Sequence, residues 1–331
     1  SEDAAVSASD LNTINDATTV AVDLTNVTSI TSSSLVDLGT LSTAIGLNQF
    51  SNDSGITTIA VSDTTIDATT LASTIDAYDS INGSGTTDMT LATGATINVD
   101  ASVDASELTH MLLDETQNRL DISDQNIVVT GNISVDNANL LSATTTGTVT
   151  ASITTTESIT ELKTLTETTN AYTIVIASAD ATATAEDLSA IDGKTTATID
   201  ATAVTAISGT YDQITTLYGS AGVDNLGDEA ISISEALTVT QANVIDGLTT
   251  GAITATIGNS RVSELVGGTP LLNANNNNAY TIAISSDDAA VSASDLNAIN
   301  DLTTVAVDLT NVTSITSSSL VDLGTLSTAI G

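Results

Sequence analysis

The chain carries few residues that could do nucleophilic or acid–base chemistry. His110 is its only histidine, and it has no cysteine. A nucleophilic site needs a base beside the nucleophile and a third group that orients the base, and one histidine among many serines and aspartates does not specify such a site. Paired carboxylates can hydrolyse glycosides, but aromatic residues, the usual platforms for sugar rings, make up only 2% of the chain. The sequence therefore predicts that the protein is not an enzyme.

Two acidic clusters have the residue types of a calcium site. Calcium prefers oxygen ligands, and a glycine helps the loop to bend around the ion. The first cluster, in VDNLGDEA, comprises Asp224, Asp228 and Glu229, and the second, in SSDDAA, comprises Asp287 and Asp288. Neither cluster has the twelve-residue EF-hand spacing. We take Ca²⁺ as the candidate cofactor and these five residues as its candidate ligands.

A column of aspartates follows the last apolar residue of one predicted strand in successive repeats. Its members are Asp23, Asp100, Asp200 and Asp308. Stacked carboxylates about 5 Å apart repel each other unless a cation or water separates them, which would suit a Ca²⁺ ladder. Alternatively, each aspartate ends its strand and accepts backbone N–H bonds in a turn. We favour the turn.

The charge balance limits the partners. The chain has 41 acidic and four basic residues, for a net charge of −37. Nucleic-acid binding needs a cationic surface, and anionic membranes also attract cations, so both partners are disfavoured. No apolar run approaches the ~18 residues of a membrane-spanning helix. The charge instead favours multivalent cations as counter-ions.

A near-identical segment occurs twice in the chain. Residues 286–331 repeat residues 1–46. The differing pairs are Glu2 and Asp287, Thr13 and Ala298, and Ala17 and Leu302. Self-similarity at a fixed offset is the signature of a repeat architecture.

A shorter, degenerate repeat lies inside this long period. Alternating apolar positions predict one strand in each unit: Ile59/Val61, Ile127/Val129, Ile174/Ile176, Ile231/Ile233 and Ile282/Ile284. A second strand is predicted in the same way: Val20/Val22, Ile97/Val99, Val149, Ile199, Ile253 and Val305/Val307. Between the two strands, serine or threonine three residues before aspartate predicts a capped short helix: Ser7 with Asp10, Thr184 with Asp187, and Ser292 with Asp295.

The spacing of these elements predicts the fold. Strands about 20 residues apart with a helical turn between them favour parallel pairing over hairpins. We expect one continuous parallel β-solenoid over residues 1–331, elongated, with short interspersed helices, leucine-rich-repeat-like or β-helix-like. An array of β-sandwich domains is the alternative. The expected solenoid units are approximately 1–55, 56–124, 125–170, 171–229, 230–278 and 279–331.

Several phrases of the sequence resemble a known repeat family. They are VSASDLNAINDLTT, ISGTYDQITTLYGSAGVDNLGDEAISIS and TTATIDATAVTAISGT. The family consists of Thr-, Asp- and Ala-rich tandem repeats in giant cell-surface and secreted proteins of marine cyanobacteria and other aquatic bacteria. Some of these proteins carry calcium-binding Gly-Gly-x-Gly-x-Asp nonapeptides, which this chain lacks. The resemblance implies an extracellular surface or filament role.

Composition, repeats and resemblance together predict a structural protein. We expect an extracellular filament, sheath or surface layer built by end-to-end or tandem stacking, with the same chain as its partner and divalent cations as further candidate partners. The alternative is the stalk of a large secreted surface adhesin. We also expect the chain to be a segment of a longer protein or a subunit whose ends meet other subunits.

Overall fold

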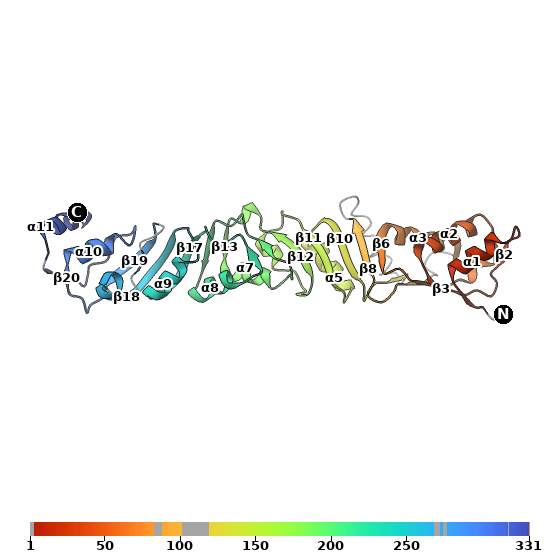
Figure 1. The fold of residues 1–331 in the computed structure, drawn as a ribbon, viewed down its shortest axis with the longest axis horizontal. Helices are drawn as coiled ribbons and strands as arrows, with labels where there is room; N and C mark the ends of the chain where they lie inside the picture. Colours follow the sequence, from red (N-terminus) through yellow and green to blue (C-terminus); the bar gives the residue numbers. More distant parts are fainter. Residues whose placement is uncertain are drawn as a thin grey trace. The chain divides into compact units, whose positions relative to one another are not determined.

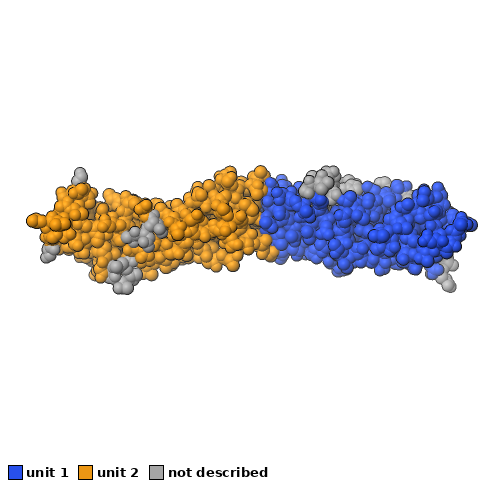
Figure 2. Space-filling view, turned by 45° about the horizontal axis from the view of Figure 1, so that its top comes forward, with its two compact units in different colours: residues 1–154, 165–173 blue, residues 155–164, 174–331 orange. Residues whose placement is uncertain are grey.

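Contacts within the chain divide it into two compact units. The computed structural model describes residues 3–82, 88–100, 119–267, 272–273, 277–316 and 318–330. Figure 2 colours the units separately: unit 1 comprises residues 1–154 and 165–173, and unit 2 comprises residues 155–164 and 174–331. His110 lies outside the described residues.

Unit 1 alternates short strands with helices. Its elements are β1 (Ala5–Val6), α1 (Ala8–Asp16), β2 (Val22–Asp23), β3 (Ser29–Ser33), α2 (Leu35–Gly46), β4 (Phe50–Ser51), a 3₁₀ turn (Asp53–Gly55), β5 (Thr58–Val61), β6 (Thr65–Asp67), α3 (Ala68–Asn82), β7 (Asp88–Thr90), β8 (Thr96–Asp100), β9 (Leu120–Asp121), β10 (Asn126–Ile133), α5 (Val135–Thr144), β11 (Val149–Ile153) and the first residues of β12 (Ala171–Val175). Strands pair in the orders β1-β3-β5-β7-β9, β6-β8-β10-β11-β12 and β2-β4.

Unit 2 repeats this alternation. Its elements are α6 (Ile159–Leu162), the last residues of β12, a 3₁₀ turn (Ser178–Asp180), β13 (Thr182–Thr184), α7 (Ala185–Asp192), β14 (Ile199–Asp200), β15 (Ala206–Gly209), α8 (Tyr211–Gly219), β16 (Val223–Asp224), β17 (Ala230–Leu237), α9 (Val239–Asp246), β18 (Ile253–Ser260), a π-helical turn (Ser263–Gly267), β19 (Ala279–Ile284), β20 (Ala290–Ser292), α10 (Ala293–Asn300), β21 (Ser314–Thr316) and α11 (Leu320–Ile330). Strands pair in the orders β12-β14-β16, β13-β15-β17-β18-β19 and β20-β21.

The prediction of a single parallel β-solenoid is wrong. The chain forms an α/β fold in which several separate parallel sheets, the larger ones of five and seven strands, accompany substantial helices. The predicted helices were short, yet α2 has 12 residues and α3 has 15. Helices pack on one another, as α7, α8 and α9 do in unit 2 (Figure 1). The alternating strand pattern dominated the sequence signal, whereas helices rich in Ala, Ser and Thr have a weak amphipathic signal. The division into six units stays a prediction.

The parallel pairing and most of the predicted strand positions are confirmed. Every pair of described strands is parallel. The first predicted strand is buried at both apolar positions in all five repeats. The second is buried at Ile97, Val149, Ile199 and Ile253, but Val20 and Val305 are exposed. Side-chain alternation therefore located strands well wherever another repeat covers them on both sides.

Serine and threonine cap the helices as predicted. Ser292 Oγ accepts a hydrogen bond from Asp295 N at 3.0 Å and donates to Asp295 Oδ2 at 2.7 Å. Ser7 caps α1 and Thr184 caps α7 in the same manner. A side-chain cap satisfies one of the four N–H groups that the first turn of a helix leaves free. These contacts span three residues, so local sequence is sufficient to produce them.

A second cap comes from the following repeat. The first helical N–H of α2, at Leu35, donates to Asp63 Oδ2 at 2.7 Å. The same arrangement recurs between Ile159 N and Asp180 Oδ2 (3.0 Å), Tyr211 N and Glu235 Oε1 (2.9 Å), and Val262 N and Asp288 Oδ2 (2.8 Å). A carboxylate at a helix N-terminus also interacts favourably with the helix dipole. Acidic side chains therefore join one repeat to the next.

Candidate functional site

The first predicted calcium cluster is divided between the surface and the interior. Asp224, at the end of β16, and Asp228, in the turn that follows, are exposed. Glu229 is fully buried, and its Oε2 accepts hydrogen bonds from Tyr218 Oη at 2.6 Å and Gly227 N at 2.8 Å. The Glu229 carboxylate is therefore already hydrogen-bonded within the protein.

The second predicted cluster holds the chain segment before the π-helical turn. Asp287 Oδ2 lies 2.5 Å from Arg261 Nη2, and Asp288 Oδ2 accepts from Val262 N. The two adjacent carboxylates thus bind two adjacent residues of the preceding repeat. Within the part of the chain that the structure describes, no three acidic or histidine side chains gather closely enough to hold a metal ion.

Three aspartates of the column, Asp23, Asp200 and Asp308, form Asx turns, which confirms for them the interpretation that we favoured. The residues that follow Asp100 lie outside the described part of the chain. Asp200 Oδ1 accepts from Thr202 N at 2.9 Å and from Thr202 Oγ1 at 2.5 Å. The same two bonds to the threonine two positions on are made by Asp23 and Asp308. An Asx turn reverses the chain at the end of a strand without another backbone partner. These carboxylates therefore shape the loops after the strands.

An asparagine 29 or 25 residues further along the chain reinforces two of these turns. Asn52 Nδ2 donates to Asp23 Oδ1, and Asn225 Nδ2 donates to Asp200 Oδ1, both at 2.9 Å. Both asparagines have left-handed backbones, with φ of 60° and 65°, a conformation that Asn tolerates better than most residues. Hydrogen bonds from Thr202, and then from Asn225, hold the pKa of Asp200 below its usual value. The side chains of Thr25 and Asn52 lower the pKa of Asp23 in the same way.

Each unit also buries an asparagine–tyrosine cluster that the sequence analysis missed. In unit 1, Asn170 Oδ1 accepts from Val149 N at 2.8 Å, and its Nδ2 donates to Ser142 Oγ and Tyr172 Oη, both at 2.9 Å. The tripeptide Asn-Ala-Tyr at 170–172 recurs at 278–280, and this repetition is the signal that could have revealed the cluster.

The cluster in unit 2 has the same geometry with an acid in place of the serine. Asn278 Oδ1 accepts from Ile253 N at 2.8 Å, and its Nδ2 donates to Asp246 Oδ1 at 2.9 Å and to Tyr280 Oη at 3.1 Å. Asp246 Oδ2 also accepts from Asn273 Nδ2 at 3.1 Å. A buried polar network is tolerated only when its polar atoms are paired. Here the Asn278 amide donates to the Asp246 carboxylate, so each pairs with the other.

A loop beside each cluster requires glycine. Thr145 Oγ1 donates to Gln125 O at 2.6 Å in unit 1, and Thr249 Oγ1 donates to Glu229 O at 2.7 Å in unit 2. A Cβ at Gly147 would lie 2.1 Å from Gln125 O, and one at Gly251 would lie 2.3 Å from Glu229 O. Gln125 and Glu229 therefore occupy equivalent positions beneath a tightly folded loop.

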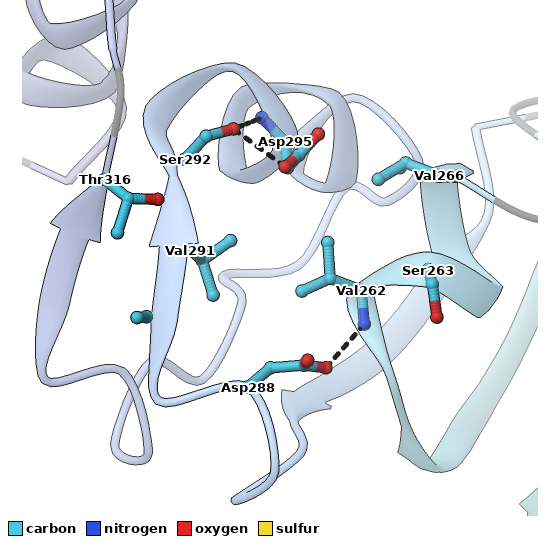
Figure 3. A pocket seen from close by; sticks show the side chains of 10 residues that line it. Val262, Ser263, Val266, Asp288, Val291, Ser292, Asp295 and Thr316 are labelled. Carbon is cyan, nitrogen blue, oxygen red and sulfur yellow. Dashed lines mark hydrogen bonds between the residues drawn. The ribbon is translucent and has the colours of Figure 1, made fainter.

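A pocket of about 370 Å³ lies beside Asp288 in unit 2. Figure 3 shows valines 262, 266 and 291 with the carboxylates of Asp288 and Asp295 around it. Asp288 points to the Val262 N–H and Asp295 to Ser292, so both acids are engaged with their neighbours. The described lining contains no histidine, cysteine or lysine. The pocket is therefore lined by acids that are already hydrogen-bonded within the protein.

Comparison of the chain with protein-family models, curated protein sequences and solved structures gives no match. Among the helices of the described residues, none combines the length and apolar character that crossing a bilayer requires.

Proposed function

We propose that the chain is a structural repeat protein of an extracellular filament, sheath or surface layer, assembled from further repeats of its own kind. The observation that carries this proposal is the recurring cap in which an acid of one repeat accepts from the first helical N–H of the preceding repeat. Such contacts join each repeat to its neighbour, so a further repeat could be added in the same way.

The chemistry of the acidic residues supports the same proposal. Carboxylates recur in structural roles: they cap helices, form Asx turns and pair with buried amides. The resemblance to tandem repeats of bacterial surface proteins favours an extracellular location. We expect antibody labelling of intact source cells to detect the protein on their surface, and labelling only after lysis would contradict that location.

Divalent cations are part of the proposal as counter-ions. Bringing chains of net charge −37 together costs Coulomb repulsion, which bound or condensed cations reduce. Exposed acids such as Asp224 and Asp228 are accessible to such ions, whereas Glu229 is buried.

Negative-stain electron microscopy with millimolar Ca²⁺ and then with chelator tests assembly. Filaments that fray in chelator would support a cation-dependent fibre. Filaments that are indifferent to chelator would retain the fibre and overturn the calcium proposal. Isolated particles in both conditions would overturn self-assembly and favour the adhesin stalk. The double variant Asp224→Asn/Asp228→Asn should raise the Ca²⁺ needed, and the exposed Asp136→Asn serves as the matched control.

A further inference from the structure

One segment has the same sequence in both units and opposite exposure. Residues 29–46 and 314–331 are identical. In the first copy, Ile30, Leu35 and Leu38 are 1%, 7% and 0% exposed. In the second copy, the equivalent Ile315, Leu320 and Leu323 are 43%, 88% and 38% exposed. We call these three side chains of the second copy the open face.

Local structure does not explain the difference. Ser34 Oγ bonds to Asp37 at the start of α2, and Ser319 Oγ bonds in the same way to Asp322 near the start of α11. Helix α11 packs on α10 as α2 packs on α1. Both copies therefore have the same helix, the same cap and the same neighbour on one side.

The difference lies in what covers the other side. In unit 1, β5 pairs with β3, aligning Ile59 with Ile30, and α3 packs on α2. Tyr78 Oη donates to Leu38 O at 3.2 Å, and Asp63 caps Leu35 N. In unit 2, within the described residues, β21 pairs only with β20.

We propose that the open face binds one further repeat with the sequence pattern of residues 47–82. The occupant supplies a parallel strand with apolar residues at the positions of Ile59 and Val61, an acid at the position of Asp63 and a helix that carries a tyrosine like Tyr78. The argument rests on identity: one surface in this chain already binds such a segment, and the open face has the same sequence. The inference rests on the proposed function, because it names the surface through which repeats are added.

Hydrogen exchange measured by mass spectrometry tests the open face directly. Peptides from residues 30–45 and 315–330 have the same mass and intrinsic exchange chemistry, so one isotopic envelope reports both copies. We expect two populations of equal size in the 331-residue chain, one slow and one fast. Adding a second copy of residues 47–100 after Gly331 should merge them into one slow population. A matched extension carrying Ile59→Asp and Val61→Asp should leave the fast population in place.

Two results would overturn the proposal. A fast population that persists in the unmodified extension would show that this repeat does not cover the face. Merging of the populations in the unextended chain as its concentration rises would show that a second copy covers the face instead.

A pair of matched substitutions gives a second measurement. Leu35→Asp should lower the melting temperature of the 331-residue chain by several degrees, whereas Leu320→Asp should leave it unchanged. In the extended chain, Leu320→Asp should become destabilising, and an unchanged melting temperature there would contradict the proposal. The proposed function can fail independently of this inference. If the added repeat covers the open face but the protein never forms filaments or layers, the inference stands and the structural role is overturned.

Discussion

The buried asparagine–tyrosine clusters of the two units have the same hydrogen-bond geometry but differ in charge. Unit 1 uses neutral side chains, Gln125 and Ser142, around its Asn-Ala-Tyr tripeptide. Unit 2 places Glu229 and Asp246 at the equivalent positions. The asparagine, the tyrosine, the threonine-held loop and the required glycine are common to both. The comparison shows that the repeat accepts a buried acid wherever N–H or O–H donors surround the carboxylate.

The largest expected effect comes from removing the asparagines. Asn278→Ala leaves the Ile253 N–H without its acceptor and removes a donor from a buried carboxylate, so we expect a loss of about 4 kcal/mol in the free energy of unfolding. Asn170→Ala removes the same contacts beside a neutral serine and should cost about 3 kcal/mol. Urea unfolding followed by circular dichroism measures both. Equal losses would show that the acid adds nothing to the network.

Replacing Gln125 with glutamate should lower the free energy of unfolding more than replacing Glu229 with glutamine. Gln125 Nε2 donates to Ala92 O at 3.3 Å and also contacts Asp124. Gln125→Glu places a carboxylate against these oxygens, with a loss of about 3 kcal/mol. Glu229→Gln keeps one oxygen for the Gly227 N–H and should cost about 1 kcal/mol. The same urea titration at neutral pH checks the order, and a larger loss from Glu229→Gln would contradict it.

High pH should destabilise unit 2 through its tyrosines. Burial and the hydrogen bond to Glu229 raise the pKa of Tyr218 above its ordinary value, and burial also raises the pKa of Tyr280. The unfolded chain loses these protons above about pH 10, while the folded chain retains them. Stability is therefore full below that pH and falls as pH rises.

Tyr218→Phe isolates this effect. It removes one titrating group, so unfolding free energy should fall less steeply above about pH 10, at a cost near neutral pH of about 1 kcal/mol from the lost hydrogen bond to Glu229. Urea unfolding across this pH range, with tyrosinate absorbance as a second signal, measures the slope. An unchanged slope would show that Tyr218 ionises equally easily in both states.

The smallest expected effect concerns the Asx turns. The hydrogen bonds from Thr202 lower the pKa of Asp200 in the folded state, so their stabilisation is present above about pH 4 and is lost as pH falls through the folded pKa. Because Thr202 is exposed and the variant keeps the hydrogen bond from the backbone N of residue 202, Thr202→Val should cost below about 0.5 kcal/mol. Nuclear magnetic resonance titration should show the Asp200 pKa rising in the variant. An unchanged pKa would contradict the assignment of its cause.

Short-range features of the fold were predictable from the chain. Serine three residues before aspartate predicted the caps of α1 and α10, and aspartate two residues before threonine formed the expected turns. The pairing of Asn170 with Ser142, 28 residues away, was not predictable, because nothing near Asn170 indicates which side chain will face it. The sequence suggested Glu229 as a calcium ligand because it lies in an acidic, glycine-containing segment. Sequence spacing does not reveal that its carboxylate is buried and accepts a hydrogen bond from Tyr218.

The two identical segments separate local from tertiary control. Residues 29–46 and 314–331 both form a strand and a serine-capped helix, because alternation and capping act over two to four residues. Leu35 and Leu38 are buried by β5 and α3, elements that follow the first copy in the chain, whereas Leu41 and its counterpart Leu326 are buried in both copies. Burial requires neighbouring atoms from distant sequence, so Ile30, Leu35 and Leu38 belong to the core of unit 1. The identical Ile315, Leu320 and Leu323 lie at the surface of unit 2.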